Sequence, residues 1–176
     1  MTYTIAQINQ MSLNDFVQAL GSVFEDTPTI AAQTWHKRPF RDREHLYQGL
    51  ISQMLELSDE EKMALMRSHP DLGSRLKMAP DSIAEQAGAG LDRLSPQEYD
   101  RFMALNQAYK QKFGFPFIMA VKGQTKEAIL TAFEARLNHD FQVERERALE
   151  EIAKIVQFRL GDRLIDYSTL RGNEVQ

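Results

Sequence analysis

The chain has 176 residues, of which 43% are hydrophobic and 26% charged, with a formal net charge of −4 at pH 7. This balance is typical of one folded domain, and the acidic charge argues against a nucleic-acid partner, since such domains usually carry a basic surface. The absence of cysteine excludes disulfides, thiolate nucleophiles and zinc–thiolate sites, and it favours the cytoplasm.

The sequence shows neither a membrane segment nor a signal peptide. No apolar run approaches the roughly 20 residues that cross a bilayer, and the N-terminus MTYTIAQINQMS lacks a basic start and an apolar middle. We therefore expect a cytoplasmic protein with no membrane partner. Its single domain should cover residues 1–168, followed by a flexible tail over residues 169–176.

Helix starts recur along the chain, each marked by a capping residue that precedes apolar positions three or four apart. They are predicted at Ser12, Thr27, Asp42, Ser58, Ser82, Ser95 and Thr125, and a long last helix follows. The fourth helix runs into the stretch MRSHPDLG, residues 66–73. Pro70 disfavours helical backbone at the residue before it, so His69 should lie at or just past the helix end.

The run FGFPFIMAVKG, residues 113–123, interrupts this helical pattern. Its aromatic and aliphatic residues could form a strand, but no second run of similar strength is available to pair with it. We therefore predict a buried extended connection near residues 115–121, whose backbone groups could contact a ligand. The predicted fold is a single compact all-α domain of about eight helices.

The four histidines show no metal-binding spacing. His36, His45, His69 and His139 include no pair in the HExxH arrangement, so we expect no metal site. His69 alone precedes a proline and lies between apolar positions. It could cap the helix structurally, through its favourable interaction with the helix C-terminus, or it could transfer a proton.

Two further features also have a structural alternative. Ser82 and Glu85 have capping-box spacing, but together with Gln86 they could also form an anion-binding helix N-terminus. Arg159 lies on the apolar stripe of the last helix. It could extend to water or pair with a structural acid, or it could bind a substrate carboxylate through two parallel hydrogen bonds.

Several blocks of the sequence resemble a known family. HPDLG, SIAEQAGAGLDRLS and FGFPFIMAVKG occur in the order seen in the 2-oxo-4-hydroxy-4-carboxy-5-ureidoimidazoline (OHCU) decarboxylases. RPFRDREHL and EIAKIVQFRLGDRL extend the resemblance from about Leu13 to Leu164. It implies an all-helical homodimer that needs no metal or organic cofactor and converts OHCU to (S)-allantoin and carbon dioxide in urate degradation. It also implies a substrate that decays by itself to racemic allantoin.

The same resemblance implies a role for particular residues. His69, Glu85 and Arg159 match the catalytic residues of the family, although the motif around Arg159 is looser. The matching substrate contacts are Pro70, Ser82, Gln86, Phe115, Pro116, Phe117, Ile118 and Met119. The family commonly has alanine at the position of Gly73, a departure that affects backbone freedom rather than chemistry.

Two other classes of protein remain alternatives. A non-catalytic helical module that binds a metabolite or a protein would not need the three catalytic side chains to converge. A ureide hydrolase would need a nucleophile or an activated water, for which this sequence offers poor material. A decarboxylase should instead place His69, Glu85 and Arg159 around one pocket closed by residues 115–119. His69 and Glu85 should then lie within hydrogen-bond reach, directly or through one water.

Overall fold

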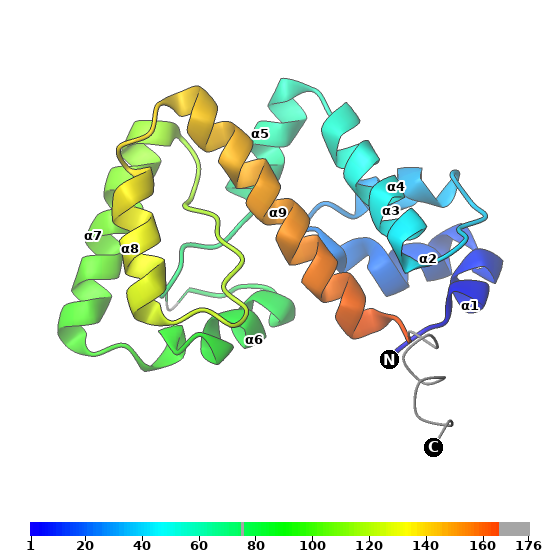
Figure 1. The fold of residues 1–176 in the computed structure, drawn as a ribbon, viewed down its shortest axis with the longest axis horizontal. Coiled ribbons are helices and arrows are strands. Elements are labelled where there is room, and N and C mark those ends of the chain that lie inside the picture. Colours follow the sequence, from blue (N-terminus) through cyan, green and yellow to red (C-terminus); the bar gives the residue numbers. More distant parts are fainter. Residues whose placement is uncertain (75, 166–176) are drawn as a thin grey trace, which may run out of the picture. The chain divides into compact units, whose positions relative to one another are not determined.

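The computed structural model describes residues 1–74 and 76–165 (Figure 1). These residues form nine α-helices, two short 3-10 helices and no β-strand, which confirms the all-α prediction. They fall into two compact units, residues 1–58 with 156–165 and residues 59–155. The single domain over residues 1–168 stays a prediction, and the tail at 169–176 lies outside the described residues.

The first unit contains α1 (Ile5–Gln10), α2 (Leu13–Leu20), η1 (Gly21–Val23), α3 (Pro28–Trp35), α4 (Arg43–Glu56) and the last part of α9 (Phe141–Arg163). In it, α3 packs against both α2 and α4. The side chains of Ser12 and Asp42 accept hydrogen bonds from backbone N–H groups in the first turns of α2 and α4, which confirms both predicted caps. None of the described helices is long and apolar enough to span a bilayer.

Helix α1 was not predicted from the sequence. It has six residues, and its only apolar pair at helical spacing is Ile5 and Ile8, of which Ile8 alone is buried. Its capping box was nevertheless visible, because Thr4 and Gln7 have the required spacing and form both reciprocal hydrogen bonds. Helix α1 brings the described total to nine rather than about eight.

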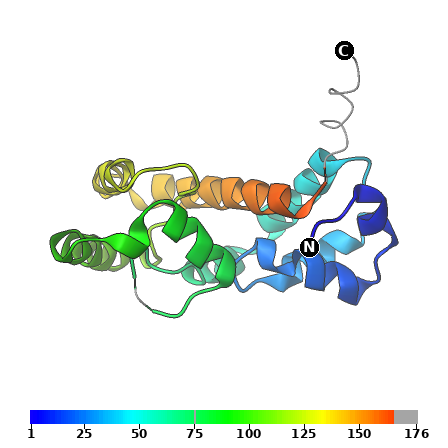
Figure 2. The same cartoon turned by 90° about the horizontal axis from the view of Figure 1, so that it is seen from below.

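The second unit contains α5 (Asp59–Arg67), α6 (Pro80–Gly88), η2 (Leu91–Arg93), α7 (Pro96–Phe113), α8 (Lys126–Arg136) and the first part of α9. Figures 1 and 2 both show α8 alongside α7. Ser95 and Thr125 cap these two helices as predicted. Helix α7 ends at Phe113, and its C-cap residue Gly114 has a φ of 76°, which is favourable only for a residue such as glycine.

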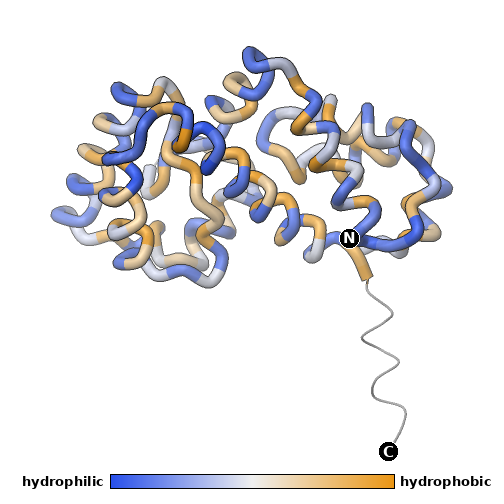
Figure 3. The backbone as a smooth tube through the Cα atoms, turned by 45° about the horizontal axis from the view of Figure 1, so that its top comes forward, coloured by the Kyte–Doolittle hydropathy of each residue, from blue (hydrophilic) through white to orange (hydrophobic). Residues whose placement is uncertain are grey.

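The core of the second unit is aromatic. The ring of Tyr109 lies 4.6–5.8 Å, centroid to centroid, from those of Phe113, Phe115, Phe117 and Phe133. Phe117 also stacks on Phe133 at 3.9 Å. These contacts bury the connection between α7 and α8, which forms neither helix nor strand, as predicted for residues 115–121. Figure 3 shows this connection as a largely hydrophobic stretch of chain.

Candidate active site

His69 lies just beyond the end of α5, as Pro70 predicted. Helix α5 ends at Arg67, and His69 is 8% exposed. Its Nδ1 atom is 2.9 Å from the carbonyl oxygen of Leu65. Because a carbonyl oxygen can only accept, Nδ1 carries a hydrogen, and Nε2 is the basic nitrogen of the neutral ring. The local fold therefore fixes which ring atom can take up a proton.

The predicted helix start at Ser82 is wrong. Helix α6 begins at Pro80, with Ala79 in the N-cap position. Proline is favoured at the first position of a helix, where its missing N–H has no cost. Ser82 is therefore the third helical residue and not the cap.

The three polar residues of this motif nevertheless lie together. Ser82 and Gln86 are buried, and Glu85 is partly exposed. Their spacing of three and four residues places them on one face of α6. This face can present a hydroxyl, a carboxylate and an amide to the same ligand.

The structure joins the two motifs that the sequence singled out. The backbone N–H of Gly73 donates to Oε1 of Gln86 at 2.9 Å, and this hydrogen bond is buried. Helix α7 holds the same loop through two more contacts. Asn106 Nδ2 donates to the carbonyl oxygen of Leu72 at 2.9 Å, and Lys110 forms a 2.6 Å ion pair with Asp71. Neither α7 residue belongs to a motif, so no sequence signal pointed to them.

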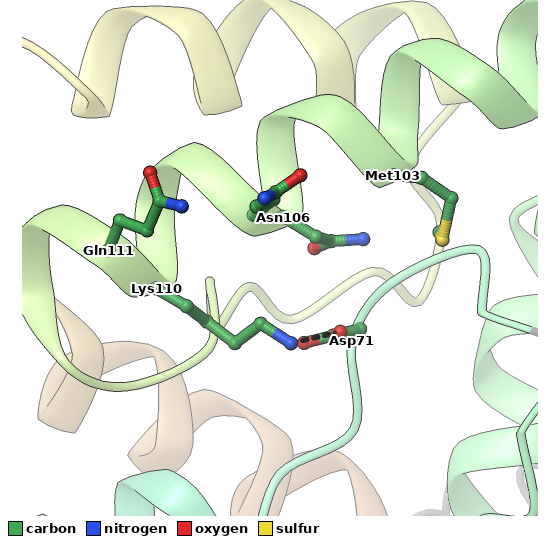
Figure 4. Close-up of a pocket in the computed structure, with 6 residues that line it drawn as sticks. Asp71, Met103, Asn106, Lys110 and Gln111 are labelled. Carbon is green, nitrogen blue, oxygen red and sulfur yellow. Dashed lines mark hydrogen bonds and ion pairs between the residues drawn. The ribbon is translucent and has the colours of Figure 1, made fainter.

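A pocket of about 330 Å³ lies beside this loop (Figure 4). Figure 4 shows Lys110 reaching from α7 to Asp71 at its edge. The pocket is lined by Asp71, Met103, Asn106, Gln107, Lys110 and Gln111. None of the predicted catalytic or substrate-binding residues lines it.

The predicted substrate-binding segment is held on both sides of Met119. The carbonyl oxygen of Ile118 accepts from Arg136 Nη1 at 2.7 Å, and the N–H of Ala120 donates to Glu151 Oε2 at 2.9 Å. Residues 115–118 are buried, whereas Met119 is partly exposed. The backbone N–H and C=O of Met119 form no hydrogen bond with a described residue.

Arg136 belongs to a buried polar network that no sequence motif indicated. Its Nε donates at 2.6 Å to Oε1 of Glu144, a residue with no exposed surface. The hydroxyl of Tyr109 donates to the same oxygen at 2.5 Å, and His139 Nδ1 lies 2.9 Å from the other. Burial is the main cause that raises the pKa of Tyr109, and the hydrogen bond to Glu144 is the second. The phenol therefore keeps its proton.

Arg159 lies in the other unit and has a structural partner. It forms a 3.0 Å ion pair with Glu25, and each residue is 3% exposed. The alternative that Arg159 pairs with an acid is therefore observed. His69 and Glu85 belong to the second unit. The convergence of the three catalytic residues, and the approach of His69 to Glu85, stay predictions.

Within residues 1–74 and 76–165, no three His, Asp or Glu side chains are grouped so that they could hold a metal ion. The candidate site contains a buried histidine, His69, whose tautomer is fixed by its hydrogen bond to Leu65. The hydrogen bond from Gly73 to Gln86 joins the loop after His69 to α6, which carries the buried polar residues Ser82 and Gln86.

Comparison with known proteins defines the family. The family model described as OHCU decarboxylase matches residues 9–161. An OHCU decarboxylase from Halalkalicoccus jeotgali is 42% identical, with 90% of each chain covered. One from Haloferax volcanii is 39% identical, with 91% of this chain and 95% of the relative covered. The chain belongs to the OHCU decarboxylase family.

Solved structures have the same fold. A crystal structure of (S)-allantoin synthase superposes with a TM-score of 0.73 and 26% identity, covering 92% of this chain and 54% of that one. A structure of an OHCU decarboxylase in the presence of (S)-allantoin has a TM-score of 0.67, covering 85% of this chain and 96% of that one. At 23% identity, this second likeness concerns the fold alone.

Proposed function

We propose that this chain decarboxylates OHCU to (S)-allantoin in urate degradation. The family match over residues 9–161 supports this activity. The structural observation that carries the proposal is the buried hydrogen bond from Gly73 to Gln86. It connects the loop that bears His69 to the helix that bears Ser82 and Glu85.

The reaction determines which groups are useful. The bond between the ring carbon and the carboxylate breaks, carbon dioxide leaves, and the electron pair stays on the ring carbon. Hydrogen-bond donors fixed against the ring stabilise this charge as it spreads into the ring system. A proton must then reach the carbon from one face only, because the product is a single enantiomer.

His69 is the proposed proton-transfer residue. Histidine titrates near neutrality and suits proton transfer at working pH. The bond from Nδ1 to Leu65 leaves Nε2 as the atom that exchanges the proton. Glu85 would orient the imidazole or its proton. Pro70 restricts the backbone beside His69 and contributes to the same wall of the site.

The remaining predicted residues bind the substrate. Gln86 uses Oε1 for Gly73, while its Nε2 donates to no described residue and is available to a ligand. Ser82, one turn earlier on α6, adds a hydroxyl. The segment 115–119 would offer backbone polar groups, above all the N–H of Met119, whereas Pro116 has no N–H to donate. Arg159 would bind the substrate carboxylate while Glu25 holds its guanidinium.

We further propose that the enzyme works without a metal or organic cofactor, in the cytoplasm and as a homodimer. The lack of cysteine supports the cytoplasm. The family resemblance supports the other two features.

The test is to generate OHCU freshly from urate and to follow circular dichroism with and without the protein. We expect faster formation of optically active allantoin. Racemic allantoin at the spontaneous rate would contradict the proposal and favour a non-catalytic binding module.

A further inference from the structure

Two charged side chains hold the backbone on either side of Met119. Arg136 reaches the carbonyl oxygen of Ile118 from α8, and Glu151 accepts the N–H of Ala120 from α9. Arg136, Glu151 and the segment all belong to the second unit. Arg136 lies outside the sequence blocks that indicated function, and Glu151 is the first residue of the block EIAKIVQFRLGDRL, where no role was predicted for it.

In an extended chain, alternate residues direct their backbone polar groups to opposite sides. Ile118 and Ala120 therefore share one side, where Arg136 and Glu151 bind them. By the same geometry, we expect the polar groups of Met119 to point to the other side. Met119 is also the only residue of the run 115–121 that is not buried. The segment thus has one side fixed by protein and one side whose backbone groups have no partner among the described residues.

Both holding side chains are themselves held. Arg136 is fixed by Glu144 and lies over the ring of Phe117, 4.4 Å from its centroid. Oε1 of Glu151 pairs with Arg147 at 2.9 Å and with Lys154 at 2.7 Å, which leaves Oε2 for Ala120.

We infer that Arg136 and Glu151 are positioning residues, which hold residues 118–120 so that the backbone of Met119 faces the substrate. This inference rests on the proposed function. Fixed donors are effective in catalysis because they need no reorganisation when charge develops. Loosening either contact should lower kcat while the substrate still binds.

The test compares two substitutions at Glu151. Glu151→Ala removes the acceptor for Ala120, and we expect kcat to fall about tenfold or more, as for a small misplacement of catalytic groups, with KM changed by less than about threefold. Glu151→Gln loses the ion pairs but keeps an oxygen acceptor for Ala120, so its kcat should stay close to that of the wild type. Glu150→Ala removes a neighbouring exposed partner of Arg147 and is the control.

Equal kcat for Glu151→Ala and Glu150→Ala would overturn the inference.

Arg136→Lys provides a second test, because one ammonium cannot reproduce the contacts of Arg136 to both Glu144 and Ile118. Its kcat should also fall, whereas Ile129→Val, a buried change on the same helix, should affect only stability.

Amide hydrogen exchange separates this inference from the proposed function. Ala120 should exchange slowly in the wild type and in Glu151→Gln, and faster in Glu151→Ala. Unchanged exchange would show that Glu151 does not hold the segment. A wild type that forms no optically active allantoin would instead overturn the proposed function, and the positioning role with it.

Discussion

Arg159 and Glu25 form a buried ion pair with an N–O distance of 3.0 Å, although they are 134 positions apart in the sequence. A buried guanidinium without an anion would be costly. Glu25 therefore explains how Arg159 can lie on an apolar stripe whether or not it also binds substrate.

Arg159→Lys should weaken substrate binding more than it harms the fold. A point charge cannot reproduce two parallel N–H···O bonds, and the loss should be about 1.5–3 kcal/mol. Michaelis constants and melting temperatures provide the measurement. A lower melting temperature with unchanged KM and kcat would make Arg159 only the structural partner of Glu25.

Gln86→Met should destabilise the second unit by about 1–3 kcal/mol, because it leaves the buried N–H of Gly73 without an acceptor. Urea unfolding measures the change. Gln97→Met, an exposed substitution on α7, should stay within about 0.5 kcal/mol of the wild type. Equal unfolding free energies for the two variants would be incompatible with a structural role of the Gly73–Gln86 bond.

Gly73→Ala should lower both the stability and the activity of the protein. Gly73 has a φ of +72°, and an added Cβ would lie 2.9 Å from Leu94 Cδ1. Gly123→Ala is the control, since its φ is +78° and no atom lies within 4 Å of the added carbon. Both substitutions should lower the free energy of unfolding by about 1–2 kcal/mol, because alanine is strained in left-handed backbone. Only Gly73→Ala should also reduce activity. Equal activity of the two variants would refute this.

His69→Asn should stay folded but lose stereocontrol. Asparagine keeps a polar group beside Pro70 and cannot carry a proton near neutral pH, so the cost to stability should be about 1 kcal/mol or less. Allantoin formed in its presence should be racemic and appear at the spontaneous rate. An excess of the (S) product at near wild-type speed would show that His69 does not transfer the proton.

Glu151 should contribute stability that disappears in acid. Burial acts to raise its pKa, but hydrogen bonds from Lys154 and Ala120 and the charges of Lys154 and Arg147 outweigh it and hold the pKa below the ordinary 4.5. A lowered pKa in the folded state gives stability that is present above pH 4.5 and is lost as the pH falls through the lowered value. The difference in unfolding free energy between wild type and Glu151→Gln should shrink over that range. A difference in unfolding free energy that stays constant with pH would contradict this prediction.

The sequence by itself determined the local features of this protein. Caps at Ser12, Asp42, Ser95 and Thr125, and the end of α5 before Pro70, follow from short-range rules of backbone and side-chain chemistry. The buried connection near residues 115–121 was predictable because its apolar run had no partner strand. Helix α1 was missed, although Gln7 completes its capping box. The start of α6 was misplaced, although Pro80 marks the first position of the helix.

Only the tertiary structure decided which distant side chains hold the motifs in place. Asn106 and Lys110 hold the His69 loop, Arg136 and Glu151 hold the segment around Met119, and Glu25 holds Arg159. A sequence shows that a buried charge or an unpaired backbone group needs a partner, but not which one. That choice depends on how the helices pack, because residues far apart in the chain become neighbours only when their apolar faces are buried together.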